Sequence, residues 1–271
     1  MGDEFWLITQ PDHARLAGAI ARAVGNRSFV KSTRAAVYDA VDRHDDGWAA
    51  HDHAPTLDDS GQPTDVFDTL RAIEHAAWLG SAELAAAADP YLGLLVALHS
   101  LALSALAAGA VAQGPLDDEH RRRQFDLNKI QHALIEIVEH LRGRLGLAVD
   151  RPLRLGMADG WSTPAEDQLK FDFRLLQASD ALSLRLCCDH PPAGLVPQLC
   201  PRPAAAAIAL QTRVAHDGAM LVQPWPFAEP AIRLDVPYRA VSALTHGDVS
   251  RFREAFAGAP VRVAHVELRS S

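Results

Sequence analysis

Histidine and aspartate side chains occur at four places where the surrounding residues are apolar. His13 lies on the apolar stripe of one predicted helix, His44 and Asp45 continue the stripe of a second, and His99 and Asp180 interrupt two strongly apolar helices. One buried histidine is readily explained by a hydrogen bond to a backbone carbonyl. Several imidazoles and carboxylates on different helices are harder to explain singly, because converging on a cation offsets all their burial costs together. The pattern indicates a metal centre.

Asp180 is the most informative of these residues. Phe173, Leu176, Leu184 and Cys187 lie four and seven positions to either side of it, on the same face of the predicted helix. Because the opposite face is apolar too, the helix should be buried, and Asp180 with it. A buried carboxylate must be paired, protonated or bound to a cation.

The order of these residues resembles the H…HD…D signature of the HD-domain superfamily of metal-dependent phosphohydrolases. His13 comes first, His44-Asp45 is followed by x-Gly, and Asp180 lies in the late helix "LLQASDALSL". More closely, the opening "FWLITQPDHARLAGAI", the "HDDGW" element, the "LLVALHS" helix and that late helix resemble the bacterial domain of unknown function 3891 family. The resemblance to this family spans most of the chain.

The superfamily resemblance implies a site with four metal ligands, His13, His44, Asp45 and Asp180. Such a mixed set suits one or two six-coordinate ions of Fe, Mn, Ni, Co or Zn with water in open positions. The implied activity is hydrolysis of a phosphorylated small molecule, a phosphomonoester or a nucleotide, with Asp45 and His99 as catalytic residues. His99 could instead be a further ligand, or the ligand of a second ion.

One departure from the superfamily leaves other functions open. Many of these phosphohydrolases carry a lysine soon after His-Asp-x-Gly, where this chain has Trp48, so a phosphate group would need Arg15, Arg34, Arg43 or another cation. Trp48 either stacks on a flat substrate group or only packs. A metal oxygenase with two irons is an alternative, as is a protein that binds a metal or another ligand without catalysis.

Two other metal sites can be drawn from the sequence, and both are weaker. His51 and His53 could join His44, although their stretch is polar and should be solvated. A structural zinc site could use Cys187, Cys188, His190 and Cys200, but the chain has no C-x-x-C pair. There is no Gly-rich phosphate loop, G-x-S-x-G elbow or H-E-x-x-H helix to suggest another chemistry.

The elements that would position the first site follow from capping and periodicity. Phe5 to Gln10 should be a strand, and the pattern T-Q-P-D should start a helix from about Gln10 to Val24. A second helix should begin near Ser32 or Thr33 and stop at Gly47, before a polar surface loop. Further helices are predicted at Val66 to Leu79, Pro90 to Ala112, Glu119 to Leu145 and Pro164 to Cys188.

The pattern of the sequence changes from helical to strand-like near residue 200. A hairpin should turn at His216-Asp217-Gly218, and "AIRLDVPYRAV" and "VRVAHVEL" read as strands. We therefore predict a mainly α-helical fold, an HD-like helical bundle, with a small antiparallel β-sheet built from the C-terminal region and the N-terminal strand. The predicted division is an HD-like helical domain at residues 1–200 and a strand-rich element at 201–271.

Composition limits the partners and the location. The 271 residues are 48% hydrophobic and 22% charged, with a net charge of -8, which disfavours nucleic acid and anionic membranes as partners. Three cysteines, two of them adjacent, favour a reducing cytoplasm over a disulfide framework. Tyr91 to Ala112 is long enough to span a membrane, but His99 and acidic flanks favour a buried helix. The expected partner is a small-molecule substrate, with a homodimer left open.

Overall fold

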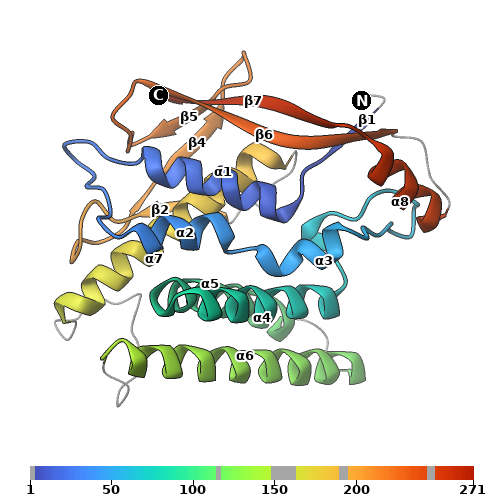
Figure 1. Ribbon diagram of the computed structural model, residues 1–271, viewed down its shortest axis with the longest axis horizontal. Coiled ribbons are helices and arrows are strands. Elements are labelled where there is room, and N and C mark those ends of the chain that lie inside the picture. The colour runs from blue at the N-terminus through green and yellow to red at the C-terminus, as the bar shows by residue number, and fades with distance from the viewer. Residues whose placement is uncertain (1–3, 114–116, 148–162, 189–194, 243–247) are drawn as a thin grey trace.

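The helices form layers beneath a curled sheet in the computed structural model, which describes residues 4–113, 117–147, 163–188, 195–242 and 248–271 (Figure 1). The sheet covers α1, which packs against α2 and α7, and α4 and α5 separate this layer from α6. The helices are α1 (Gln10–Ala23), α2 (Ala35–Arg43), α3 (Ala49–Asp52), α4 (Arg71–Ala88), α5 (Pro90–Ala112), α6 (Asp118–Arg144), α7 (Pro164–Cys187) and α8 (Val249–Gly258). A mainly helical fold is confirmed.

Three long helices begin where the sequence predicts, and each start has a side-chain cap. Thr9 accepts a hydrogen bond from the backbone N–H of Asp12 at the start of α1. Asp89 caps α5 in the same way, and Thr163 caps α7 with the reciprocal bond from Glu166 that completes a capping box. A proline in the first turn of each helix adds to this, because its missing N–H has no helical partner there in any case.

Other boundaries differ from the prediction. The helix expected at Val66 to Leu79 is wrong at both ends: Asp65 caps a separate 3-10 turn (Val66–Asp68), Thr69 is extended, and α4 continues to Ala88. It ends there because Pro90 favours an extended conformation at the residue before it. The second helix begins at Ala35 rather than near Ser32. A 3-10 turn (Asp46–Trp48) includes the predicted stop at Gly47, and the loop predicted after it contains the short helix α3.

The sheet is larger than predicted and only partly antiparallel. Five strands lie in the order β1 (Glu4–Leu7), β6 (Ala231–Ser242), β7 (Val261–Ser270), β5 (Met220–Gln223) and β4 (Gln211–Val214). β5 and β7 are parallel, so the prediction of a small antiparallel sheet is wrong in this respect. β1 joins the sheet as expected, beside β6, but it ends at Leu7 rather than Gln10, and the predicted hairpin forms between β4 and β5. A separate ladder joins β2 (Gln198–Leu199) and β3 (Ile208–Ala209).

The helical layers and the sheet share one hydrophobic core. Leu176 of α7, Val236 of β6 and Leu268 of β7 all belong to it, and each is at most 1% exposed. The proposed division of the chain at residue 200 stays a prediction.

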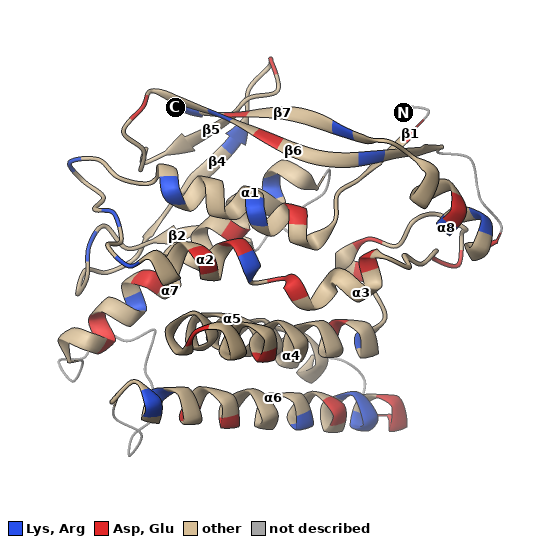
Figure 2. Ribbon diagram, in the orientation of Figure 1, with Lys and Arg blue, Asp and Glu red and all other residues tan. Residues whose placement is uncertain are grey.

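Helix α5 is the most apolar element of the fold. It has no charged residue, whereas charged side chains recur along α6 (Figure 2). Of the helices that the structure describes, α5 alone is long and apolar enough to span a membrane by length and composition, and half of its most apolar window is buried inside the protein. Its N-terminal half, Tyr91 to Ser100, is buried throughout and packs against α2 and α7. The predicted burial of the helix therefore holds for this half, whereas Leu106 in the C-terminal half is 72% exposed.

Candidate metal centre

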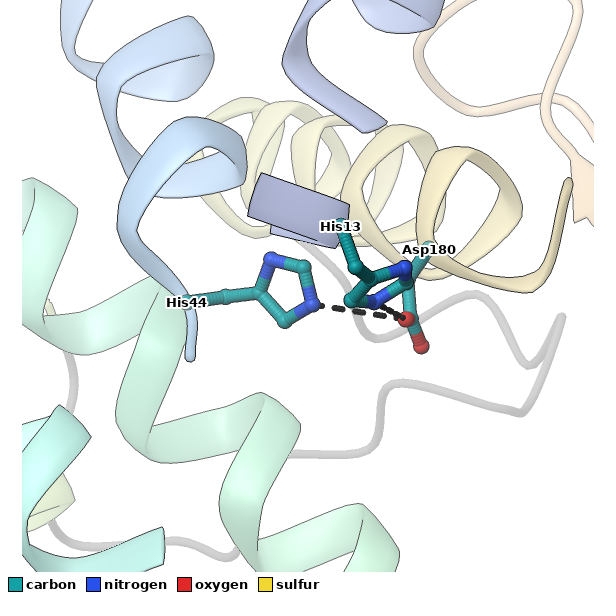
Figure 3. Close-up of side chains that lie close together, drawn as sticks. All are labelled: His13, His44 and Asp180. Atoms are coloured by element: carbon teal, nitrogen blue, oxygen red, sulfur yellow. Dashed lines mark hydrogen bonds and ion pairs between the residues drawn. The ribbon is translucent and has the colours of Figure 1, made fainter. Parts of the chain in front are cut away.

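Three buried side chains from three helices point toward one another (Figure 3). His13 projects from α1, His44 from the end of α2 and Asp180 from α7. Asp180 Oδ1 lies 3.0 Å from His13 Nε2 and 3.3 Å from His44 Nε2. The side chains are at most 9% exposed. The structure thus brings together residues that are 167 positions apart in the chain.

Asp45 and His99 complete what we call the His–Asp cluster, which comprises His13, His44, Asp45, His99 and Asp180. Asp45 Oδ2 lies 3.4 Å from His44 Nε2 and 3.7 Å from His13 Nε2. His99 comes from the centre of α5, and its Nε2 is 3.6 Å from the other oxygen of Asp180, Oδ2. All five residues singled out in the sequence therefore meet, whereas their catalytic and ligand roles stay predictions.

Local structure at the start of α1 and at the end of α2 determines where His13 and His44 lie. His13 stands in the first turn of α1, and its backbone N–H donates to the carbonyl of Thr9, the residue that caps the helix. His44 is the C-terminal cap of α2, so the chain leaves the helix immediately after the imidazole and Asp45 follows in a non-helical conformation. The adjacent pair can therefore present both side chains to the same point.

Glycine is needed at position 47 for a reason other than the predicted end of a helix. Its backbone is not in the left-handed region, and α2 has already ended at Arg43. Instead, its N–H donates to Ser81 Oγ of α4 at 2.9 Å, and a Cβ at this position would lie 2.2 Å from the carbonyl oxygen of Ala77. Glycine is needed here because α4 packs directly on the chain beside the His–Asp cluster.

The hydrogen bonds of the histidines direct their Nε2 atoms into the cluster. His44 Nδ1 lies 2.8 Å from the carbonyl oxygen of Val41, which can only accept, so Nδ1 carries a proton. His44 Nε2 is buried beside two carboxylates, yet no hydrogen-bond geometry satisfies it. Nitrogen and carboxylate oxygen atoms facing one another across such distances suit a shared cation. The cluster of His13, His44 and Asp180 could therefore hold a metal ion.

The charges of His44 and Asp180 shift the pKa of each other's side chain. Burial opposes the charged form of His44, but Asp45 and Asp180 outweigh it and raise its pKa to about 9. Burial alone would raise the pKa of Asp180, but His13 and His44 hold it well below its usual range. Burial lowers the pKa of His99 to about 4, so this imidazole is neutral at pH 7. Without a metal, a protonated His44 supplies the positive charge that the carboxylates require.

Within the described part of the chain, neither alternative metal site brings three of its residues together. Among the residues that the structure describes, the one group of three candidate ligand atoms within 4.8 Å of one another is His13, His44 and Asp180. His51 instead contacts Trp48 edge to face, and His53 Nδ1 donates to the backbone of its own helix. Cys187, Cys188 and Cys200 form no disulfide within the described part of the chain. His190 lies outside the described residues.

The arginines considered for phosphate binding are engaged elsewhere. Arg15 pairs with Asp12, and Arg43 pairs with Asp46. The guanidinium of Arg34 lies over the ring of Tyr91, at the start of α5. Trp48, at the place of the superfamily's lysine, is 3% exposed and packs inside the fold, so it does not form a stacking surface at a site mouth.

Ser183 is a neighbour of the cluster that sequence reasoning missed. It is fully buried, lies one turn after Asp180 on α7, and its Oγ is 2.9 Å from His13 Nδ1. Its spacing of three from Asp180 was a usable signal, because residues i and i+3 share a helix face.

Comparison with known proteins places the chain in a family. A family profile described as "Protein of unknown function (DUF3891)" matches residues 1–243, and the chain belongs to this family. No curated protein and no solved structure matches the chain.

Proposed function

We propose that this chain binds a divalent transition metal through His13, His44, Asp45 and Asp180 and hydrolyses a phosphorylated small molecule, as enzymes of the HD-domain superfamily do. The observation that carries the proposal is the convergence of two buried Nε2 atoms on buried carboxylates, with no hydrogen-bond partner for that of His44. The nitrogen and carboxylate oxygen atoms face one another at 3.0 to 3.4 Å, and one shared cation could bind them together. The small-molecule partner, the homodimer and the cytoplasmic location stay predictions.

The residues of the cluster would divide the chemistry between them. A bound ion with open positions would lower the pKa of a water molecule and polarise a phosphoryl oxygen. His99 is neutral and faces the Oδ2 side of Asp180, where it could accept a proton from the attacking water or serve as a further ligand. Asp45, whose side chain is 11% exposed, is the most open carboxylate and can orient that water.

The surroundings of the cluster bear on the substrate. Because Arg15, Arg34 and Arg43 contact other side chains and Trp48 stands at the place of the lysine, these four residues do not form a basic pocket beside the carboxylates. The charge of a phosphate group would be met mainly by the ion itself. We therefore expect phosphomonoesters of small, weakly charged molecules to be better substrates than nucleoside triphosphates.

A metal oxygenase is the second candidate, and one observation favours it. The two oxygens of Asp180 face different partners, Oδ1 toward His13 and His44 and Oδ2 toward His99. The Nδ1 atom of His99 is buried without a hydrogen-bond partner. Asp180 and His99 would then help to hold a second ion, as a di-iron oxygenase would need.

The metal is tested by elemental analysis of protein purified without chelator. We expect about one or two equivalents of transition metal per chain, and their loss in Asp180→Asn, which removes the central carboxylate charge. Asp172→Asn is a matched control, because Asp172 is a buried carboxylate two turns earlier on α7 that binds Tyr91 and Gln168 instead. Wild-type protein without metal would leave only a non-catalytic role.

The reaction is tested with a panel of phosphomonoesters and nucleotides. We expect phosphate release that is abolished in His44→Ala and preserved in His75→Ala, because His75 is also buried but packs on Trp78 rather than in the cluster. Two irons per chain with oxygen-dependent turnover and no phosphate release would favour the oxygenase. Bound metal without turnover in either assay would argue for a binding protein.

A further inference from the structure

We propose that Ser183 is a positioning residue that holds His13 in the tautomer required of a metal ligand; this inference rests on the proposed metal centre. Ser183 Oγ makes two contacts, to the backbone carbonyl oxygen of Asp180 at 2.8 Å and to His13 Nδ1 at 2.9 Å. It therefore connects the ligand on α1 to the helix turn that carries the ligand on α7.

The positions of the protons follow from these two contacts. A carbonyl oxygen can only accept, so Ser183 donates its single hydroxyl proton to the backbone carbonyl oxygen of Asp180. The Oγ atom is then left as an acceptor toward His13, and His13 Nδ1 must carry the proton that it donates. With Nδ1 protonated and an ion bound, the lone pair of neutral His13 lies on Nε2; without an ion, Nε2 can only donate to the ionised Asp180 Oδ1, 3.0 Å away.

In both proposed histidine ligands Nδ1 carries the proton, but the group that accepts the hydrogen bond from Nδ1 differs between them. His44 donates its Nδ1–H to the carbonyl of Val41, three residues earlier in its own helix. For His13, the contact of Nδ1 is with Ser183 Oγ at 2.9 Å rather than with a carbonyl of its own helix. Ser183 supplies the acceptor from another helix. Hydrogen-bond partners of this kind orient a metal-bound imidazole and raise its basicity, and removing one typically weakens metal binding 10- to 100-fold.

The test compares metal affinity in three variants. Ser183→Ala removes the acceptor, and Ser183→Thr retains the hydroxyl. Ser104→Ala is the matched control, because Ser104 is also fully buried and its hydroxyl donates to the carbonyl three residues earlier, Leu101 O, but it lies outside the His–Asp cluster. Zn²⁺ affinity is measured by competition with a chromophoric chelator, and Co²⁺ absorption reports the coordination.

We expect Zn²⁺ binding by Ser183→Ala to be about 10- to 100-fold weaker than in the wild type, with Ser104→Ala unchanged and Ser183→Thr closer to the wild type. Equal affinity of Ser183→Ala and the wild type overturns the inference and leaves the metal centre intact. Equal losses in Ser183→Ala and Ser104→Ala also overturn it, because the effect is then one of packing. A wild type that binds neither ion overturns the proposed function, and the inference with it.

A second measurement reads the tautomer directly. In protein with ¹⁵N-labelled histidine, the imidazole nitrogen shifts distinguish Nδ1–H from Nε2–H, and the Zn²⁺-loaded state is diamagnetic and observable. We expect His13 to carry its proton on Nδ1 in the Zn²⁺-loaded wild type, and its Nδ1 shift to change in Ser183→Ala. A wild-type His13 with its proton on Nε2 contradicts the inference whatever the affinities are.

Discussion

The residues of the His–Asp cluster could be found from the sequence because each stands out against its helix face. His13, His99 and Asp180 sit on apolar stripes, where a polar side chain has no reason to be buried alone. Gly47 and Ser183 could not be assigned in the same way. The need for glycine at position 47 comes from the backbone of α4, and the task of Ser183 comes from a ring on α1. Such contacts depend on how the helices pack, which periodicity alone does not give.

At Gly47, we expect substitution to be costly because the added methyl has no space. In Gly47→Ala the Cβ would meet the carbonyl of Ala77 and the backbone nitrogen of Ser81, 2.5 Å away, so α4 must shift. We expect a loss of about 1 to 3 kcal/mol in the free energy of unfolding. Gly109→Ala, in open space on α5, should instead gain about 0.5 to 1 kcal/mol. Urea denaturation measures both, and an unchanged Gly47→Ala would contradict this packing.

Asp52 gives a stability difference that depends on pH. Its carboxylate accepts the N–H of Gln10, but burial, assisted by Asp45 and Asp12, raises its pKa to about 6. The folded state thus holds the proton more tightly than the unfolded state, and this stabilisation, full below about pH 4, is lost as the pH rises through 6.

We therefore expect Asp52→Asn, whose amide oxygen can still accept from Gln10, to be more stable than the wild type by about 1 to 2 kcal/mol at pH 8. The advantage should shrink to nothing as the pH falls from 6 to 4. Urea denaturation at pH 4, 6 and 8 with chelator present measures it. A constant difference across this range would show that the carboxylate charge is not the cause.

At the scale of elements, capped starts were predictable, whereas pairings between distant segments were not. Helix starts are marked by Thr9, Asp89 and Thr163. Their side chains accept hydrogen bonds from backbone N–H groups two or three residues later, and such local contacts can be predicted from the sequence. Helix α8 was missed although its buried residues, Phe252 and Phe256, are spaced by four, because the flanking strands dominated the pattern. The parallel pairing of β5 and β7 depends on a crossover that no local signal marks.

The caps of α1 and α7 allow an element-level test of the site. Thr9→Ala and Thr163→Ala each remove an N-cap, and each should cost about 1 kcal/mol in the free energy of unfolding. Only Thr9 lies within a turn of a proposed ligand, His13, whereas Asp180 is 17 residues after Thr163. We expect weaker Zn²⁺ binding in Thr9→Ala alone. Equal affinities in the two variants would mean that the start of α1 does not position His13.

At the scale of the whole molecule, the proposed ligands tie together helices that are distant in the chain. α1, α2 and α7 contact one another, and α1 and α7 also contribute to the core that the sheet closes. An ion held by all three helices binds the folded state alone, because the unfolded chain does not gather its ligands. Metal binding should therefore be linked to global stability.

We expect Zn²⁺ at 100 times its dissociation constant to raise the free energy of unfolding by about 2.7 kcal/mol. The gain should vanish in Asp180→Asn and persist in Asp172→Asn. Chemical denaturation followed by both circular dichroism and tryptophan fluorescence measures it. A gain that survives in Asp180→Asn would place the ion elsewhere on the protein.

The strand order has a consequence for how the chain assembles. β7 follows every other described strand in sequence, yet it lies in the middle of the sheet, between β6 and β5. During synthesis, the earlier hairpin and the β1–β6 pair are both made before the strand that joins them, so each must keep an unpaired edge until residues 261–270 emerge. The central strand of the sheet is therefore the last of its strands to be synthesised.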